Sequence, residues 1–89
     1  MSDATDANSL PAPTAQAVLE HLVRSIVEDP DAVTVELEEG RRTTLNVRVA
    51  PGDMGRVIGR NGRVATAIRT VTRAAASRDE LEVDVEFLD

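Results

Sequence analysis

The chain has 89 residues, 42% of them hydrophobic and 29% charged, with sixteen carboxylates against ten arginines and a formal net charge of −6. This size allows one small domain with one modest core, and the composition is that of a folded globular protein. The absence of cysteine excludes disulfides and thiolate metal sites. No apolar run approaches the ~20 residues that span a bilayer, and the acidic N-terminus lacks a signal-peptide pattern, so we expect a cytoplasmic protein without a membrane segment.

The N-terminal residues, Met1 to Pro13, are rich in Ala, Asp, Ser and Pro and show no periodicity, which predicts a disordered leader. We expect the folded domain to span residues 14–89 and to open with a helix for which Thr14 is the N-cap. Apolar residues then recur at helical spacing: Val18, Leu19, Leu22, Val23, Ile26 and Val27. Pro30 disfavours the helical conformation in the residue before it, so the helix should end near Glu28.

Two strands are predicted next, because the hydrophobic period changes from helical to alternating. Their inward residues are Val33, Val35 and Leu37, then Leu45, Val47 and Val49. Only a short turn near Gly40 separates them. The pair is therefore expected to form an antiparallel hairpin.

Two helices are predicted after the turn at Ala50–Asp53. The first runs from Met54 to Ile58 with Asp53 as N-cap, and the second from about Arg63 to Ala76. Helical rotation places four residues of the second helix on one face, which we expect to be buried: Val64, Ile68, Val71 and Ala75. The same rotation places another four on the opposite side: Thr66, Arg69, Thr70 and Arg73.

A third strand is predicted at the C-terminus, with apolar residues inward: Leu81, Val83, Val85 and Phe87. The order helix, strand, strand, helix, helix, strand predicts an α+β domain in which a three-stranded sheet carries all its helices on one face. The other face of the sheet is expected to be acidic. Its carboxylates are Glu36, Glu38, Glu82, Asp84 and Glu86.

Positive charge is concentrated in one segment of this acidic chain. From Met54 to Arg78 there are six arginines and no carboxylate. The segment contains a Gly-x-x-Gly turn, Gly59 to Gly62, whose glycines suit a tight joint between two helices. The start of the second helix offers unpaired N–H groups beside Arg60 and Arg63. A helix corner with solvated arginines is the alternative, but the lack of carboxylates favours a site for phosphates.

The sequence from Val57 to Gly62 is similar to the Ile-Gly-x-x-Gly core of KH domains, and the element order resembles their type II, bacterial arrangement. The run from Gly55 to Arg69, GRVIGRNGRVATAIR, resembles small single-KH bacterial proteins of the KhpA type, and the likeness extends over essentially the whole chain from Thr14. The resemblance implies a GxxG loop that clamps about four unpaired nucleotides of RNA.

Carried over by position, the resemblance assigns a role to each residue of the motif. The clamp is Gly59, Arg60, Asn61 and Gly62; the apolar groove floor is Val57 and Ile58; Arg63 flanks the phosphates. The other arginines of the basic segment that are expected to contact RNA are Arg56, Arg69 and Arg73. Ala65 departs from eukaryote-style motifs, which have a large aliphatic residue there.

Other chemistry has little support. A phosphate-binding P-loop needs a lysine, and the chain has none. His21, the only histidine, projects away from the apolar stripe of its helix and is expected to be solvated. No nucleophile and base can be paired, and alternating carboxylates on a strand are typical of a charged sheet face rather than a metal site. We therefore expect no enzymatic activity, cofactor, metal or small-molecule substrate.

Phe87 is the only aromatic residue, so RNA recognition cannot depend on several aromatic stacking platforms. A single clamp of this kind should bind modestly, and pairing of modules would add avidity. The resemblance implies a homodimer, or association with a larger KH-containing partner of the KhpB kind, acting as an RNA chaperone or post-transcriptional regulator. The alternative function is a protein-interaction subunit whose basic face docks an acidic partner protein, with incidental RNA affinity.

Overall fold

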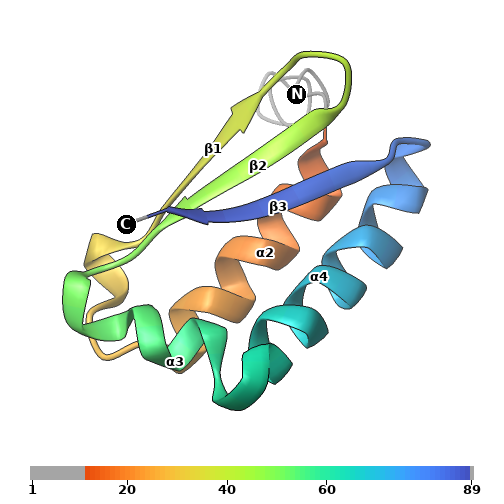
Figure 1. Cartoon of the computed structure of the whole chain (residues 1–89). Coiled ribbons are helices and arrows are strands. Elements are labelled where there is room, and N and C mark those ends of the chain that lie inside the picture. The colour runs from red at the N-terminus through yellow and green to blue at the C-terminus, as the bar shows by residue number, and fades with distance from the viewer. Residues whose placement is uncertain (1–11, 89) are drawn as a thin grey trace.

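The computed structural model describes residues 12–88 and consists of a three-stranded sheet with helices packed on one face (Figure 1). The elements in chain order are helix α2 (Pro13–Ile26), strands β1 (Thr34–Glu38) and β2 (Thr43–Arg48), helices α3 (Met54–Ile58) and α4 (Arg63–Ala76), and strand β3 (Val83–Leu88), with short 3-10 turns between them. The predicted α+β class, element order and one-sided layering are confirmed.

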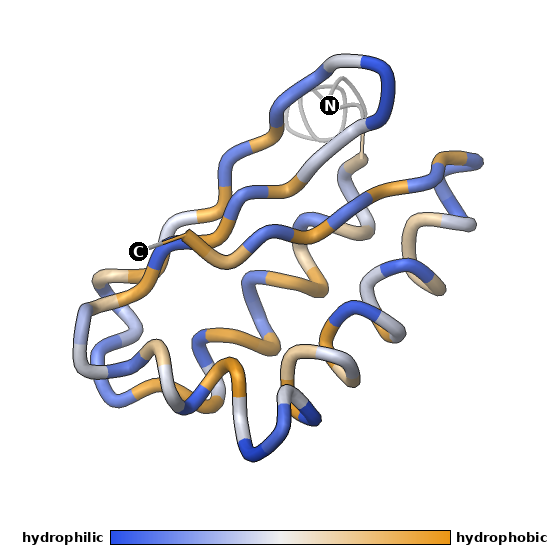
Figure 2. Tube along the Cα trace, viewed as in Figure 1, coloured by the Kyte–Doolittle hydropathy of each residue, from blue (hydrophilic) through white to orange (hydrophobic). Residues whose placement is uncertain are grey.

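Strand β2 lies at the centre of the sheet. It pairs with β1 as the predicted antiparallel hairpin, in a register that sets Leu37 opposite Leu45. It pairs with β3 in parallel, with Leu45 opposite Val85 and Val47 opposite Phe87. This register gathers the apolar residues of the three strands, apart from Leu88, on the face toward the helices, and hydrophobic and hydrophilic residues alternate along the strands (Figure 2).

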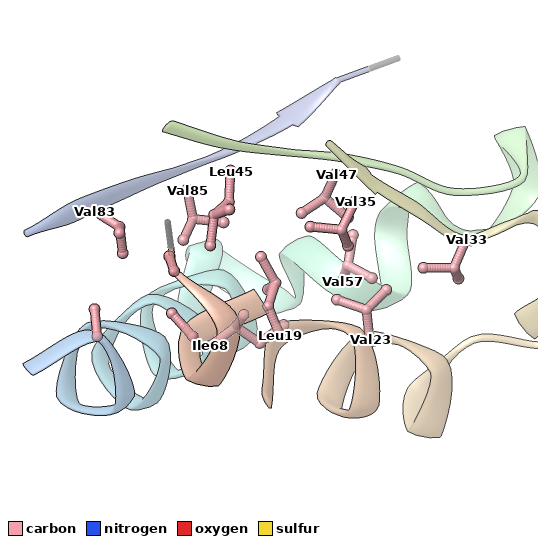
Figure 3. Close-up of a cluster of buried hydrophobic side chains, with 13 residues drawn as sticks. Leu19, Val23, Val33, Val35, Leu45, Val47, Val57, Ile68, Val83 and Val85 are labelled. Atoms are coloured by element: carbon pink, nitrogen blue, oxygen red, sulfur yellow. The ribbon is translucent and has the colours of Figure 1, made fainter. Parts of the chain in front are cut away.

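The core fills the space between the sheet and the helices (Figure 3). Leu19 and Val23 of α2, Val57 of α3 and Ile68 of α4 lie beneath the inward side chains of the strands. The largest fully buried apolar side chains are Leu19, Leu45, Val23, Val47, Val57, Val83 and Val85. They are mostly small β-branched residues, which suits a thin two-layer domain.

The N-terminal boundary differs from the prediction. Helix α2 begins at Pro13, and Ala12 is fully buried in the core, so both residues belong to the fold rather than to a leader. Thr14 lies inside the helix and is not its N-cap. The N–H groups of Thr14 and Ala15 instead donate to Asp79 Oδ2 at 3.2 and 3.3 Å. The rest of the expected leader, residues 1–11, lies outside the described residues.

The buried face of α4 also differs from the prediction. Its buried residues are Ala65, Ile68, Thr72 and Ala76, whereas Val71 is 47% exposed and Val64 and Ala75 are half-buried. The face toward the core therefore combines Ile68 with small residues, and it is rotated relative to the predicted face. Val71 lies outside the core. Strand β3 likewise begins at Val83 rather than Leu81, whose N–H donates to the Ala76 carbonyl at the end of α4.

Asp53 occupies the N-cap position of α3, as predicted, but its carboxylate does not cap that helix. The side chain is buried, and its oxygens accept from the N–H groups of Glu28 and Asp29, both at 3.1 Å. The hydrogen bond from Glu28 does most to hold the pKa of Asp53 below its ordinary value of 3.8, with the Asp29 N–H and Arg56 adding to it and burial opposing it. Asp53 thus ties the segment after α2 to the start of α3.

This linkage predicts a pH-dependent effect of Asp53→Asn. Because the folded state lowers the pKa of Asp53, the stabilisation is fully present above the ordinary pKa and is lost as the pH falls through the folded value. We expect the variant to have a smaller free energy of unfolding than the parent at pH 7, with a difference that shrinks below about pH 4.

Denaturant unfolding at several pH values measures this difference. Asp31→Asn is a matched control, since Asp31 is exposed in the turn Pro30–Ala32 and should show little effect at any pH. A pH-independent loss in Asp53→Asn would contradict the role assigned to its ionised carboxylate.

Candidate nucleic-acid interface

The Gly59–Gly62 segment forms a tight corner between α3 and α4. Three of its four residues have positive φ angles: Gly59 at 75°, Asn61 at 56° and Gly62 at 73°. Glycine and asparagine tolerate this region better than other residues. The Gly62 N–H donates to the Gly59 carbonyl at 3.2 Å and closes the turn.

Position 59 requires glycine for two reasons, a close contact with Val64 and a positive φ angle. A Cβ atom added at this position would lie 2.4 Å from Val64 Cγ2 and 2.9 Å from the Val64 nitrogen. No atom lies within 4 Å of a Cβ at Gly62, where only the backbone angle favours glycine. The packing of Val64 against Gly59 therefore sets how closely α3 and α4 meet.

The start of α4 is available to an anion. Gly62 is its N-cap residue and no side-chain hydrogen bond caps the helix. The first-turn N–H groups of a helix carry partial positive charge and suit phosphate binding. Arg60 and Arg63 are exposed on either side of this start, and no hydrogen bond or ion pair joins either side chain to another residue in the described range 12–88.

The other arginines of the predicted RNA-binding set have partners within the fold. Arg56 pairs with Glu28 Oε2 at 3.0 Å and with Asp53 Oδ1 at 3.2 Å. Arg73 lies 3.6 Å from Asp84 Oδ1 and donates to the Val83 carbonyl. These carboxylates come from outside the basic segment, so the tertiary structure neutralises part of the charge that the sequence concentrates there.

The Arg69 side chain is held by a backbone carbonyl and an aromatic ring, and it has no carboxylate partner among the described residues. Its Nε donates to the Val85 carbonyl at 3.1 Å, and its Cζ lies 5.3 Å from the centroid of the Phe87 ring. The contact is a cation–π interaction. It places Arg69 on the side of α4 that faces β3.

The two apolar residues of the motif lie at different depths. Val57 is fully buried in the core, so its side chain presents no surface to a ligand and instead supports the corner from beneath. Ile58 is half-buried and packs against the edge of the core. Ile58 is therefore the one of the two that can contribute to a groove floor.

Charge of opposite sign lies on the outer face of the sheet. Glu36, Glu38 and Glu86 are exposed there, on the far side of the sheet from the helices. Arg42 binds Asp84 at 2.8 Å and Glu82 at 3.4 Å near one end of this face. This carboxylate-rich outer face disfavours an anionic ligand.

A groove lies between α2 and α4, and the sequence pattern did not predict it. Its lining is apolar apart from one arginine. Its lining residues are Leu22, Ile26, Arg63, Val64, Ala67, Ile68 and Val71. Ile26 is 38% exposed and Val71 is 47% exposed. Sequence periodicity missed the groove because it assigned Val71 to the core.

Metal ligation and membrane insertion both lack support in residues 12–88. These residues contain no cluster of three or more His, Asp or Glu side chains placed to hold a metal ion. None of the helices in this range is long and apolar enough to cross a membrane.

Comparison with known proteins identifies the family of the chain. The sequence matches the family KhpA/KhpB, KH domain, over residues 16–87. It is 52% identical over 72 residues to RNA-binding protein KhpA of Mycobacterium tuberculosis, covering 80% of this chain and 89% of the relative. For RNA-binding protein KhpA of Streptomyces coelicolor the identity is 49% over 75 residues, covering 83% and 94%. No solved structure matches the chain.

The packing of the corner predicts a graded effect of alanine at three glycines. Gly59→Ala should lower the free energy of unfolding by about 2–4 kcal/mol, because it combines backbone strain with a steric clash. Gly62→Ala should cost about 1–2 kcal/mol from the left-handed backbone alone. Gly55→Ala, inside α3 with no atom within 4 Å of the added Cβ, is the control and should not destabilise.

Chemical denaturation of the three variants measures this order. Equal stability of Gly59→Ala and Gly55→Ala would show that contact between Val64 and Gly59 does not constrain the corner.

Proposed function

The chain belongs to the KhpA/KhpB family of KH domains, and on that premise we propose that it binds single-stranded RNA through the Gly59–Gly62 corner. One observation carries the proposal. Two exposed arginines, Arg60 and Arg63, flank the uncapped start of α4 and lack a carboxylate partner among the residues that the structure describes. The named relatives are RNA-binding proteins, which supports a non-enzymatic role.

The corner acts on the RNA backbone. Phosphates approach the positive end of α4, where Arg60 and Arg63 supply charge and the glycines allow close access to the main chain. The bases extend along the side of α4 that faces β3, past Ile58. A strand held in this way must be unpaired, because base pairing would turn the bases away from the protein.

Pairing of two modules compensates for a weak clamp. The α2–α4 groove exposes large apolar side chains and contains no carboxylate, so it suits an apolar occupant. We propose that a second copy of this chain fills it through a two-fold axis that sets groove against groove. Arg63 lines both this groove and the phosphate site, so a dimer brings two clamps close together.

We place this RNA-binding function in the cytoplasm and assign it a regulatory role. A protein that binds short unpaired RNA segments with little sequence preference fits an RNA chaperone or post-transcriptional regulator. A larger KH-containing protein of the KhpB kind would use the same α2–α4 groove in a heterodimer.

The clamp is tested by Arg60→Asp combined with Asn61→Asp. We expect RNA affinity to fall by at least about tenfold, because charge reversal removes one phosphate contact and repels others. Stability should change by less than about 0.5 kcal/mol, since Arg60 is exposed and aspartate tolerates the left-handed position of Asn61. Fluorescence anisotropy with a labelled single-stranded octamer measures the affinity, and thermal melting measures stability.

Arg78→Asp is the control for this change, because it reverses an exposed arginine in the turn Ser77–Asp79, at the other end of α4. Undiminished affinity in the double variant, or an equal loss in the control, would refute the clamp. Copurification of a partner protein that survives nuclease, without crosslinking to RNA, would instead favour the alternative of an acidic protein partner.

Dimerisation is tested by Val71→Asp, which places a charge in the exposed apolar groove. We expect a dimer of the parent protein and a monomer of the variant at roughly 100 µM in sedimentation, since a buried unpaired charge at an interface costs several kcal/mol. RNA affinity should fall with the loss of avidity. Thr70→Asp, next to it but outside the groove, should remain dimeric. A monomeric parent protein that binds RNA at full strength would contradict the paired arrangement.

A further inference from the structure

The edge of the sheet beside α4 carries an arrangement that the clamp does not use. Strand β3 is the outer strand, and two arginines of α4 reach its carbonyl groups, Arg69 at Val85 and Arg73 at Val83. The two arginines are four residues apart and lie on the same side of the helix. They differ in what else they contact.

Arg73 is neutralised and Arg69 is not. Asp84 pairs with Arg73, whereas no carboxylate among the described residues pairs with Arg69. A guanidinium has five N–H donors, and the Val85 carbonyl takes the one on Nε. The four donors on its terminal nitrogens have no partner in the described part of the chain.

The guanidinium plane of Arg69 is also fixed in orientation. The Val85 carbonyl holds its Nε, and the ring of Phe87 lies 5.3 Å from its Cζ. Phe87 is the only aromatic residue of the chain. Both residues are half-buried rather than enclosed, so the pair remains open to solvent.

We propose that Arg69 stacks against a base of the bound strand and is the base-contacting platform of this aromatic-poor groove. The inference rests on the proposed function, since it needs RNA held at the Gly59–Gly62 corner. Arginine planes serve as stacking surfaces for unpaired bases. A plane already fixed by Val85 and Phe87 loses little freedom on binding, which favours affinity.

The position of Arg69 agrees with a base contact. It lies seven residues beyond Gly62, about 10 Å along the helix axis from the phosphate site. That separation is within the span of the few nucleotides that a KH clamp holds. The side of α4 that carries Arg69 faces β3, along which the proposed function places the bases.

Stacking predicts a preference for bases with larger ring systems. A purine offers more surface to the guanidinium plane than a pyrimidine, and preferences of this kind follow stacking strength. The edge carbonyls of Val83 and Val85 each already accept a hydrogen bond from an arginine, which lessens their capacity to read a base. We therefore expect a modest purine preference without strict sequence reading.

The test compares Arg69→Lys with Arg60→Gln on three labelled RNA probes: octaadenylate, octauridylate and an octamer with abasic internal positions. Lysine keeps the charge and can still reach Val85, but it lacks the planar group. We expect Arg69→Lys to weaken octaadenylate binding about five- to tenfold, to weaken octauridylate less, and to leave the abasic octamer unchanged.

Salt dependence separates the two kinds of contact. The slope of log affinity against log salt should stay the same in Arg69→Lys, and its magnitude should fall by about 0.7 in Arg60→Gln, which loses one phosphate contact. Phe87→Leu keeps an apolar residue at the sheet edge but frees the Arg69 guanidinium. We therefore expect it to weaken octaadenylate binding, but less than Arg69→Lys does. Arg78→Lys makes the same exchange at an exposed arginine outside the expected RNA-contacting set, so it is the control and should bind all three probes as the parent does.

Two outcomes would overturn the inference: unchanged octaadenylate binding in Arg69→Lys, or an equal loss on octaadenylate and on the abasic octamer. Melting temperatures of all variants identify any loss that arises from unfolding. If Arg60→Gln weakens binding while Arg69→Lys does not, only the base platform fails. If the parent protein binds none of the probes, the proposed function itself fails.

Discussion

The contact between Gly59 and Val64 is the constraint on which the functional end of the molecule depends. With no room for a Cβ at Gly59, α3 and α4 meet at a closely packed corner, and Val57 anchors that corner in the core. The chain then has to turn through left-handed conformations at Asn61 and Gly62 before α4 begins. The same constraint that packs the helices therefore leaves the start of α4 uncapped and exposed between Arg60 and Arg63.

Buried and half-buried aspartates complete the scaffold behind this corner. Asp79 accepts hydrogen bonds from the first turn of α2, and Asp53 accepts them from the segment that follows that helix. Asp53 also pairs with Arg56. Both carboxylates thus act where backbone N–H groups need acceptors, and that of Asp53 also neutralises Arg56. Arg60 and Arg63 are exposed and have no carboxylate partner among the described residues.

Helix α4 joins three surfaces in one rigid element. One side packs Ile68 into the core, a second reaches the edge of β3 through Arg69, and a third contributes Val71 to the α2–α4 groove. In the proposed function, the first turn of this helix binds phosphate, and the bases and a second copy of the chain also meet the helix, so self-association and RNA binding would be coupled through its position.

The sequence alone determined the α+β class, the element order, the GxxG corner and the family, because alternation, helical spacing and a short glycine motif are local signals. The tertiary structure decided which apolar face of α4 is buried and which arginines remain unpaired. Packing between elements made those choices: α4 buries Ala65, Ile68, Thr72 and Ala76 and leaves Val71 exposed, while Glu28 and Asp84, which lie outside α3 and α4, pair with Arg56 and Arg73. Periodicity cannot rank two apolar stripes on one helix, and a run of like charges does not reveal which distant carboxylates will fold against it.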